Sequence, residues 1–456
     1  MSGYAALVHE YESGAGITGS SMPAVDPGAN LAATLPVWEL AGGSVASFAA
    51  AADRRRRDHG LTPLDSVLDP ARIAAAFSSE RLFRIDGAPA DAFAELSGFF
   101  KTADGWVRTH ANYSHHRVRL LAVLGLPADA DRAAAVARIA ELSAAEIEDR
   151  AGESGAIAVR VRTEQEWATT PQGKAAADGP LVAIEPRADR GVAESSAAAT
   201  QMLPLRGVRV LDMTRVIAGP TATRALALLG AEVLRIDPPQ LPEIGWQFLD
   251  TCQGKYSTLL DLRTELPIFR ELLRTADVLV TGYRPGALER IGVHPGEIRP
   301  GIVHGRVSAW GERGLWGDRR GFDSIVQAAS GISLIEGAHG NSQGASPVGA
   351  LPAQALDHGS GYLLAAGVLD ALTARERDGI GRDVRVALAR TASWLLAAPG
   401  RTPDHAPANI PGSEFAVEHA GVVTAAPVLS EYPDHPWPAS QYGTHAPNWT
   451  LRPAGI

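Results

Sequence analysis

Hydrophobic runs alternate with helical patterns through the second half of the chain. Near-continuous apolar runs at 208–214, 232–237, 277–283 and 302–310 have the length and composition of buried strands, and stretches such as 219–230 between them have helical periodicity. Apolar strands that alternate with helices are typical of a parallel sheet covered on both faces. We therefore predict an α/β protein with an open parallel sheet and helices on both sides.

The first half of the chain has a different pattern. Short strand patterns mix with helices over residues 81–190, which predicts a smaller α+β domain. Residues 35–80 are helical, with Asp69 as an N-cap before a proline at the first helical position. Residues 1–34 are rich in Gly, Ala, Ser and Pro, so we expect a weakly ordered N-terminal arm.

Composition shifts predict where the domains end. The loose segment 191–203 is expected to be a linker, followed by a large domain over 204–395. Residues 396–456 form a Pro-rich C-terminal extension. A length of 456 residues fits two to three domains of ordinary size.

Charge and cysteine content exclude several classes of protein. Lys and Arg total 42 against 51 Asp and Glu, a net charge of −9 that disfavours nucleic acid as a partner. Cys252 is the only cysteine, so neither a disulfide within the chain nor a cysteine zinc site is expected. The chain shows no signal peptide and no run of about 18 apolar residues, which predicts a cytoplasmic protein without a membrane segment. Adjacent residues on a helix point about 100° apart, so His115 and His116 do not predict a metal site.

Candidate binding residues follow several predicted strands. Ligands bind beyond the carboxyl ends of parallel strands, where helix N-termini favour anions. Gly219 permits close approach of the backbone at such an end, although no dinucleotide or P-loop motif accompanies it. Lys255, Arg284 and Arg290 lie next to other strand ends and are either phosphate ligands or solvated surface charges.

Asp357 begins the longest apolar helical pattern, which runs to Arg377. One interpretation makes this aspartate the helix N-cap. The other makes it a nucleophilic carboxylate for covalent acyl transfer, because Gly359 and Gly361 leave open space and helix N–H groups stabilise a charge.

Five segments occur in order between residues 203 and 395 and read LRGVRVLDMTRVIAGPTATRALALLGAEVLRID, GKYSTLLDLR, ADVLVTGYRPGALERIG, SAWGERGLWGDRRGFDSIVQAASGI and ALDHGSGYLLAAGVLDALTARERDGIGRDVRVALARTA. Together they resemble the large, Rossmann-like domain of class III (CaiB/BaiF) coenzyme A transferases. The resemblance implies that CoA moves from an acyl-CoA thioester to a carboxylic acid through aspartyl intermediates on Asp357. It implies no permanently bound cofactor, and a homodimer of the interlocked kind.

The resemblance also assigns residues to the substrate. The catalytic residue is Asp357. The positions that match CoA-binding residues are Val216, Ile217, Ala218, Lys255, Gly282, Tyr283, Arg284, Arg290 and Ile291. The positions that match the loop facing the acyl group are Ala309, Trp310 and Gly311.

Three positions depart from relatives in this family. Ile217 stands where some transferases carry Gln, and Pro238 stands where some carry an Arg for CoA. Phe322 stands where the racemase branch has a histidine, which disfavours an acyl-CoA racemase or epimerase. A racemase, another acyl-CoA enzyme on this scaffold or a non-catalytic acyl-CoA-binding protein stays an alternative.

The order of the domains is unusual for this family. Residues 35–80 resemble a degenerate copy of the aspartate helix, with Trp38 or Glu39 in the place of Asp357. A segment that resembles the family's small domain follows, ahead of the large domain. We hypothesise a truncated tandem fusion in which only the second copy keeps its nucleophile.

Overall fold

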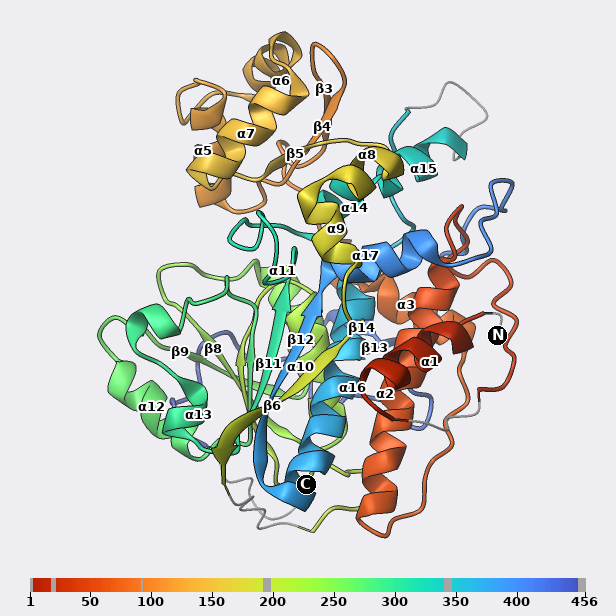
Figure 1. Cartoon of the computed structure of the whole chain (residues 1–456), viewed down its shortest axis with the longest axis vertical. Helices are drawn as coiled ribbons and strands as arrows, with labels where there is room; N and C mark the ends of the chain where they lie inside the picture. Colours follow the sequence, from red (N-terminus) through yellow and green to blue (C-terminus); the bar gives the residue numbers. More distant parts are fainter. Residues whose placement is uncertain (1–2, 18–21, 92, 192–197, 340–346, 450–456) are drawn as a thin grey trace.

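A seven-stranded sheet forms the centre of the molecule (Figure 1). The computed structural model describes residues 3–17, 22–91, 93–191, 198–339 and 347–449. The strand order is β6-β12-β11-β10-β7-β8-β9, all parallel except β6, which runs antiparallel at one edge. The strands are β6 (Ala183–Arg190), β7 (Arg209–Met213), β8 (Glu232–Asp237), β9 (Lys255–Leu259), β10 (Val278–Thr281), β11 (Val303–Ser308) and β12 (Ile380–Ala387). The predicted open parallel sheet is confirmed.

Helices cover both faces of this sheet. Val278 and Val280 point into a core shared with α10 and α16, whereas Leu279 between them packs with α12 on the opposite face. This alternation follows from the period of two in a strand. The helices of this region are α10 (Ala218–Leu228), α11 (Gly245–Thr251), α12 (Leu266–Arg274), η1 (Glu289–Ile291), α13 (Pro295–Ile298), α14 (Asp323–Ser330), α15 (Ile332–His339), α16 (Ala355–Asp378) and α17 (Leu388–Ala397).

A smaller α+β unit lies at one end of the molecule, at the top of Figure 1. Its antiparallel strands are β3 (Phe99–Lys101), β4 (Trp106–Thr109) and β5 (Ala158–Arg160). Its helices α5 (Ser114–Val123), α6 (Arg132–Glu141) and α7 (Ala144–Ser154) enclose a separate hydrophobic core. The chain then returns through α8 (Glu164–Thr169) and α9 (Pro171–Ala177), which pack against α14 and α17.

Helix α2 (Val37–Asp58) runs parallel to α16 (Figure 1). Leu40 lies against Gly359 near the first ends of the two helices, and Arg55 pairs with Glu376 at 2.7 Å near their last ends. Both helices are buried around most of their circumference. Helices α3 (Pro70–Phe77) and α4 (Ser79–Leu82) follow, and the predicted cap is confirmed because the Asp69 carboxylate accepts hydrogen bonds at the start of α3.

The starts of α2 and α16 have the same geometry. The preceding residues, Pro36 and Gln354, both have φ of −75° with ψ of 67° and 61°. The third helical residue is Glu39 in α2 and Asp357 in α16. This match supports Glu39 rather than Trp38 as the counterpart of Asp357, while the tandem fusion itself stays a prediction.

Two segments differ from the sequence prediction. The expected weakly ordered arm contains α1 (Ala5–Gly14), whose Leu7 is buried and whose Tyr11 hydroxyl donates to Asp370 in α16 at 2.5 Å. A single short helix between glycine-rich stretches has too few turns to give a clear periodicity. Strand β6 lies inside the range predicted for the small domain, yet it pairs with β12 of the large sheet.

The C-terminal extension folds back onto the rest of the chain. Strands β13 (Ala416–His419) and β14 (Val422–Ala425) join β1 (Arg84–Ile85) and β2 (Ala88–Pro89) in a four-stranded sheet. A short 3-10 helix, η2 (Ser413–Phe415), precedes them. Across the described residues, no helix has both the length and the apolar composition to cross a membrane.

Replacing Gly361 by alanine should destabilise the contact between α16 and α10. A Cβ atom at this position would lie 2.6 Å from the Ala218 carbonyl oxygen, which is backbone and cannot rotate away. We expect a loss of about 1–3 kcal/mol in the free energy of unfolding, measured by urea denaturation. Gly359→Ala is the matched control, because its Cβ would meet only the Leu40 side chain at 3.1 Å. Equal stability of the two variants would contradict this account.

Candidate active site

A cavity of about 280 Å³ lies at the carboxyl ends of β7, β10 and β11. The loops after these strands form its walls, together with the starts of α10, α16 and α5. Its lining residues are Tyr113, His115, His116, Met213, Arg215, Val216, Ile217, Ala218, Gly219, Leu241, Gly282, Tyr283, Arg284, Pro285, Val307, Ser308, Ala309, Gly317, Arg319, Arg320, Gly321, Phe322, Asp357 and Leu388. This is the position at which parallel α/β sheets bind ligands.

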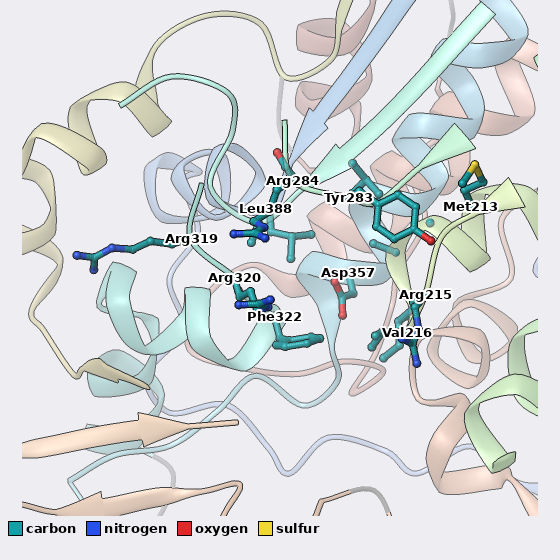
Figure 2. A pocket seen from close by; sticks show the side chains of 18 of the residues that line it. Met213, Arg215, Val216, Tyr283, Arg284, Arg319, Arg320, Phe322, Asp357 and Leu388 are labelled. Atoms are coloured by element: carbon teal, nitrogen blue, oxygen red, sulfur yellow. The ribbon is translucent and has the colours of Figure 1, made fainter. Parts of the chain in front are cut away.

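Eight of the predicted site residues meet in this cavity. Asp357 lines it with three groups of predicted residues from the loops after β7, β10 and β11. These are Val216, Ile217, Ala218, Gly282, Tyr283, Arg284 and Ala309. Figure 2 shows the Asp357 carboxylate in the middle, with Arg320 and Phe322 on one side and Arg215 and Val216 on the other.

Lys255 does not reach the cavity. Its ammonium group is fully buried and donates to Asp212 at 3.1 Å, to the Pro220 carbonyl at 2.9 Å and to Thr223 at 2.6 Å. These contacts hold the start of α10 against β7. The structure therefore gives Lys255 a structural role beneath the loop after β7 rather than a contact with CoA.

Four further predicted residues lie outside the cavity. Trp310 is buried among other tryptophans, and its indole N–H donates to the Arg320 carbonyl at 3.2 Å. Gly311 faces a separate hollow near β12. Arg290 and Ile291 are exposed on η1, where the Arg290 guanidinium donates to the Pro285 carbonyl at 3.3 Å.

Asp323 holds the first turn of α16. One of its carboxylate oxygens accepts the backbone N–H groups of Leu356 at 2.9 Å and Asp357 at 3.0 Å. Its other oxygen accepts a hydrogen bond from Gln327, which in turn accepts the N–H of Leu351 at 2.9 Å. Asp357 is therefore not the N-cap of its helix, and the N–H groups expected to stabilise its charge are already used by Asp323.

The two carboxylates disfavour each other's charged form. Burial, and after it the charge of Asp323, raises the pKa of Asp357 well above its usual range. Burial likewise raises the pKa of Asp323 to about 6, although three hydrogen bonds and Arg108 oppose the shift. Among the described residues, none donates a hydrogen bond to the Asp357 carboxylate, whose side chain faces the cavity. Such perturbed carboxyl groups in a cavity are typical of functional sites.

Glu243 fixes the loop after β7. Val216 has a φ of 69°, which is unfavourable for a β-branched residue, and its N–H donates to Glu243 at 3.1 Å. The same carboxylate pairs with Arg235 at 2.8 Å and Arg215 at 3.5 Å. The two arginines lower the pKa of Glu243 to about 2 against the effect of burial, so it stays ionised. Arg235 also pairs with Asp237 at 2.7 Å, just before Pro238.

Arginines gather on one side of the cavity. Arg284, Arg319 and Arg320 also border an adjoining cavity of about 310 Å³, together with Arg119 from α5. Arg320 and Arg119 donate to the same Gly155 carbonyl at 3.0 and 3.5 Å. None of the four forms an ion pair with an acidic side chain in the part of the chain that the structure describes. Burial and the charges of Arg119 and Arg284 lower the pKa of Arg320. Because these positive charges repel one another without an acidic partner, the region favours the binding of an anion.

Sequence reasoning missed several lining residues. They are Tyr113, His115, His116, Arg215, Ser308, Arg319, Arg320 and Leu388, and the capping residue Asp323 was missed as well. The adjacent arginines are a signal visible in the sequence, whereas the histidines come from the small unit. The described residues contain no group of three or more His, Cys, Asp or Glu side chains arranged to hold a metal.

The fold and the cavity define an α/β protein with a buried carboxyl group in a cavity at the carboxyl ends of its parallel strands. The sequence profile of CoA-transferase family III matches residues 205–424, just under half of the chain. A protein of Mycobacterium tuberculosis named a probable fatty acyl-CoA transferase is 36% identical over 214 residues, covering 42% of this chain and 52% of its own length. The formyl-CoA:oxalate CoA-transferase of Streptomyces avermitilis is 35% identical over 200 residues, covering 40% and 47%.

A crystal structure of a CaiB/BaiF family protein from Brucella suis aligns with a TM-score of 0.39 at 25% identity and covers 43% of this chain and 56% of that one. The chain spans about half the length of the curated relatives it matches.

The buried carboxylate pair predicts a stability that depends on pH. A carboxyl group whose pKa is raised by folding stabilises the folded state less as pH rises from its unfolded pKa through its folded pKa. Asparagine has no charge to bury, so Asp357→Asn removes the cost of ionising a buried carboxyl group. The urea midpoint of this variant should therefore exceed that of the parent protein at pH 8. The difference should shrink towards pH 4.5, where Asp357 is largely protonated in the folded state. A constant difference across this range would contradict the shift.

Proposed function

We propose that the protein moves CoA from an acyl-CoA thioester to a carboxylic acid through covalent intermediates on Asp357. The observation that carries the proposal is the position of Asp357 in one cavity with Val216, Ile217 and Ala218, the residues expected to receive CoA. The family match over residues 205–424 supports it. The names of two relatives, a formyl-CoA:oxalate CoA-transferase and the alpha subunit of a succinyl-CoA--L-malate CoA-transferase, pair an acyl-CoA with an organic acid in the same way.

The proposed exchange has four covalent steps. The Asp357 carboxylate attacks the thioester carbonyl, the C–S bond breaks, and a mixed anhydride and CoA thiolate result. The thiolate attacks the aspartyl carbonyl of the anhydride, which releases the donor acid and leaves an aspartyl-CoA thioester. The acceptor carboxylate attacks the aspartyl carbonyl of this thioester and expels the thiolate, which gives a second mixed anhydride between Asp357 and the acceptor. The thiolate then attacks the acceptor's carbonyl, giving the new acyl-CoA and free Asp357.

The raised pKa of Asp357 has a consequence for this chemistry. Only the ionised carboxylate is a nucleophile, and a poorly solvated carboxylate is a reactive one. Helix N–H groups at α16 do not stabilise it, because Asp323 accepts them. The first-turn N–H groups of Ala218 and Gly219 in α10 have no partner within their helix, and both residues line the cavity, so we expect these groups to bind an oxyanion.

The racemase alternative has less support. Phe322 lines the cavity and has no titratable group, and its ring stacks on His110 with centroids 3.8 Å apart.

The predicted homodimer stays a prediction, which sedimentation equilibrium would test.

Trapping of the aspartyl intermediates tests the mechanism. Incubation with a panel of acyl-CoA thioesters, followed by hydroxylamine or borohydride, should modify Asp357, and mass spectrometry of peptides should locate the change. Asp357→Ala should show no adduct and lose at least about 10³-fold of the transfer rate, since no other carboxyl group described in the cavity replaces it. Transfer without any adduct on Asp357 would refute the mechanism, and exchange of the α-hydrogen without transfer would favour the racemase.

Arg320→Gln tests whether the arginines hold the phosphates of CoA. Loss of one charge-assisted contact of about 1.5–3 kcal/mol should raise KM for the acyl-CoA by about tenfold or more, with kcat changed less. The defect should shrink at high salt, because screening weakens the wild-type contact. Arg274→Gln on the exposed face of α12 is the control and should match the wild type. An unchanged KM in Arg320→Gln would exclude this role.

A further inference from the structure

His116 is a buried polar side chain that the proposed mechanism leaves without a role. It lies in the first turn of α5 and lines the same cavity as Asp357, although it comes from the small unit and Asp357 from the large one. Only 5% of its surface is exposed. Its Nδ1 atom is buried and has no hydrogen-bond partner, which is a costly state for a polar atom.

Neighbouring rings fix the position of the His116 side chain. The ring centroids of Tyr113, His110 and Phe322 lie 5.2, 6.2 and 5.9 Å from that of His116. The ring centroid of His115, in the same helix, lies 4.1 Å from that of His116. Packing of this kind holds the imidazole in one orientation. A side chain that contacts a substrate atom needs such a fixed orientation.

The imidazole is neutral over the physiological pH range. Burial, followed by the positive charges that His115, His110, Arg320 and Arg119 would carry, lowers the pKa of His116 to about 2. A neutral imidazole offers one N–H donor and one acceptor. The N–H group of a neutral imidazole can donate a hydrogen bond to a developing oxyanion. The ring carries no extra proton that an adjacent carboxylate would take from it.

Several other donors at the cavity are already engaged. Asp323 accepts the N–H groups of Leu356 and Asp357, and Glu243 accepts the N–H of Val216. The Tyr113 hydroxyl also donates to Glu243. Ile217 contributes no side-chain donor. The uncharged side-chain donors that remain in the cavity lining are those of Tyr283, Ser308, His115 and His116, and of these four only His116 is buried.

We propose that His116 supplies the oxyanion donor, as a neutral imidazole that hydrogen-bonds the carbonyl oxygen of the acyl group bound at Asp357. The small unit would then contribute a catalytic residue to a site otherwise built by the large sheet. This inference rests on the proposed function for its chemistry, but its binding test does not require turnover.

A matched set of variants separates the hydrogen bond from the packing. His116→Phe keeps a ring and loses the donor, whereas His116→Asn keeps a donor and loses the ring. His110→Phe changes a neighbouring buried imidazole that does not line the cavity. Thermal unfolding of each variant shows whether it is folded.

Binding is measured in the Asp357→Asn background with acetyl-CoA and with S-ethyl-CoA, a thioether that lacks the carbonyl oxygen. His116→Phe should weaken the binding of acetyl-CoA by about fivefold, the equivalent of one neutral hydrogen bond of about 1 kcal/mol. The affinity for S-ethyl-CoA should stay within about twofold of the parent's. His116→Asn should recover part of the loss, and His110→Phe should bind both ligands like the parent. An equal loss of affinity for both ligands in His116→Phe, or no loss of affinity for either, would overturn the proposal.

Turnover adds a second reading with Asp357 intact. His116→Phe should lower kcat/KM by about 10²-fold, as loss of one oxyanion donor does in other acyl-transfer sites, while His110→Phe stays within about threefold. A protein that shows the carbonyl-dependent binding but transfers no acyl-CoA of the panel would refute the proposed function and leave this inference standing. Full transfer by His116→Phe would refute the inference alone.

Discussion

The hydrogen bonds from the first turn of α16 to Asp323 determine the geometry of the whole site. They join α14 to α16 across 34 residues of sequence, and through Gln327 they also fix the chain before α16. Asp357 projects into the cavity because this turn is held in place. A helix N-terminus normally stabilises a nearby carboxylate, but here the stabilised carboxylate is Asp323. Burial, and after it the repulsion of that charge, raises the pKa of Asp357, so this carboxyl group is costly to ionise.

The loop after β7 shows a comparable arrangement. Glu243 stays ionised between Arg215 and Arg235, and it holds Val216 in a conformation that its β-branched side chain disfavours. Lys255 and Asp212 form a second buried pair beneath the start of α10. Buried ion pairs contribute little net stability because both groups lose their hydration, so their value here lies in fixing a defined backbone. Glu243 and Lys255 hold the backbone of the loop after β7 and of the start of α10, whose residues line the cavity, although neither side chain lines it.

The sequence was informative where the physical signal is local. Near-continuous apolar runs predicted the parallel sheet, and Asp69 followed by proline predicted a helix start, because both depend on neighbouring residues. The position of Lys255 could not be predicted, since its partner Asp212 lies on β7, with β8 between their strands. The exclusion of Asp357 as an N-cap depends in the same way on Asp323, a residue distant in sequence. Helix α1 was missed because its buried face is short and its partner Asp370 lies 359 residues away.

The cavity depends on two parts of the chain that fold around separate cores. The small unit has its own hydrophobic core, and it meets the large sheet where α5 faces the loops after β7 and β11. The stacked rings of His110 and Phe322 join the two parts at this boundary, because one ring follows β4 and the other precedes α14. Such a contact is flat and apolar, so it fixes the distance between the parts without needing charged partners. The small unit therefore lines the same cavity as Asp357, and any shift of α5 relative to α14 would change the surroundings of this carboxyl group directly.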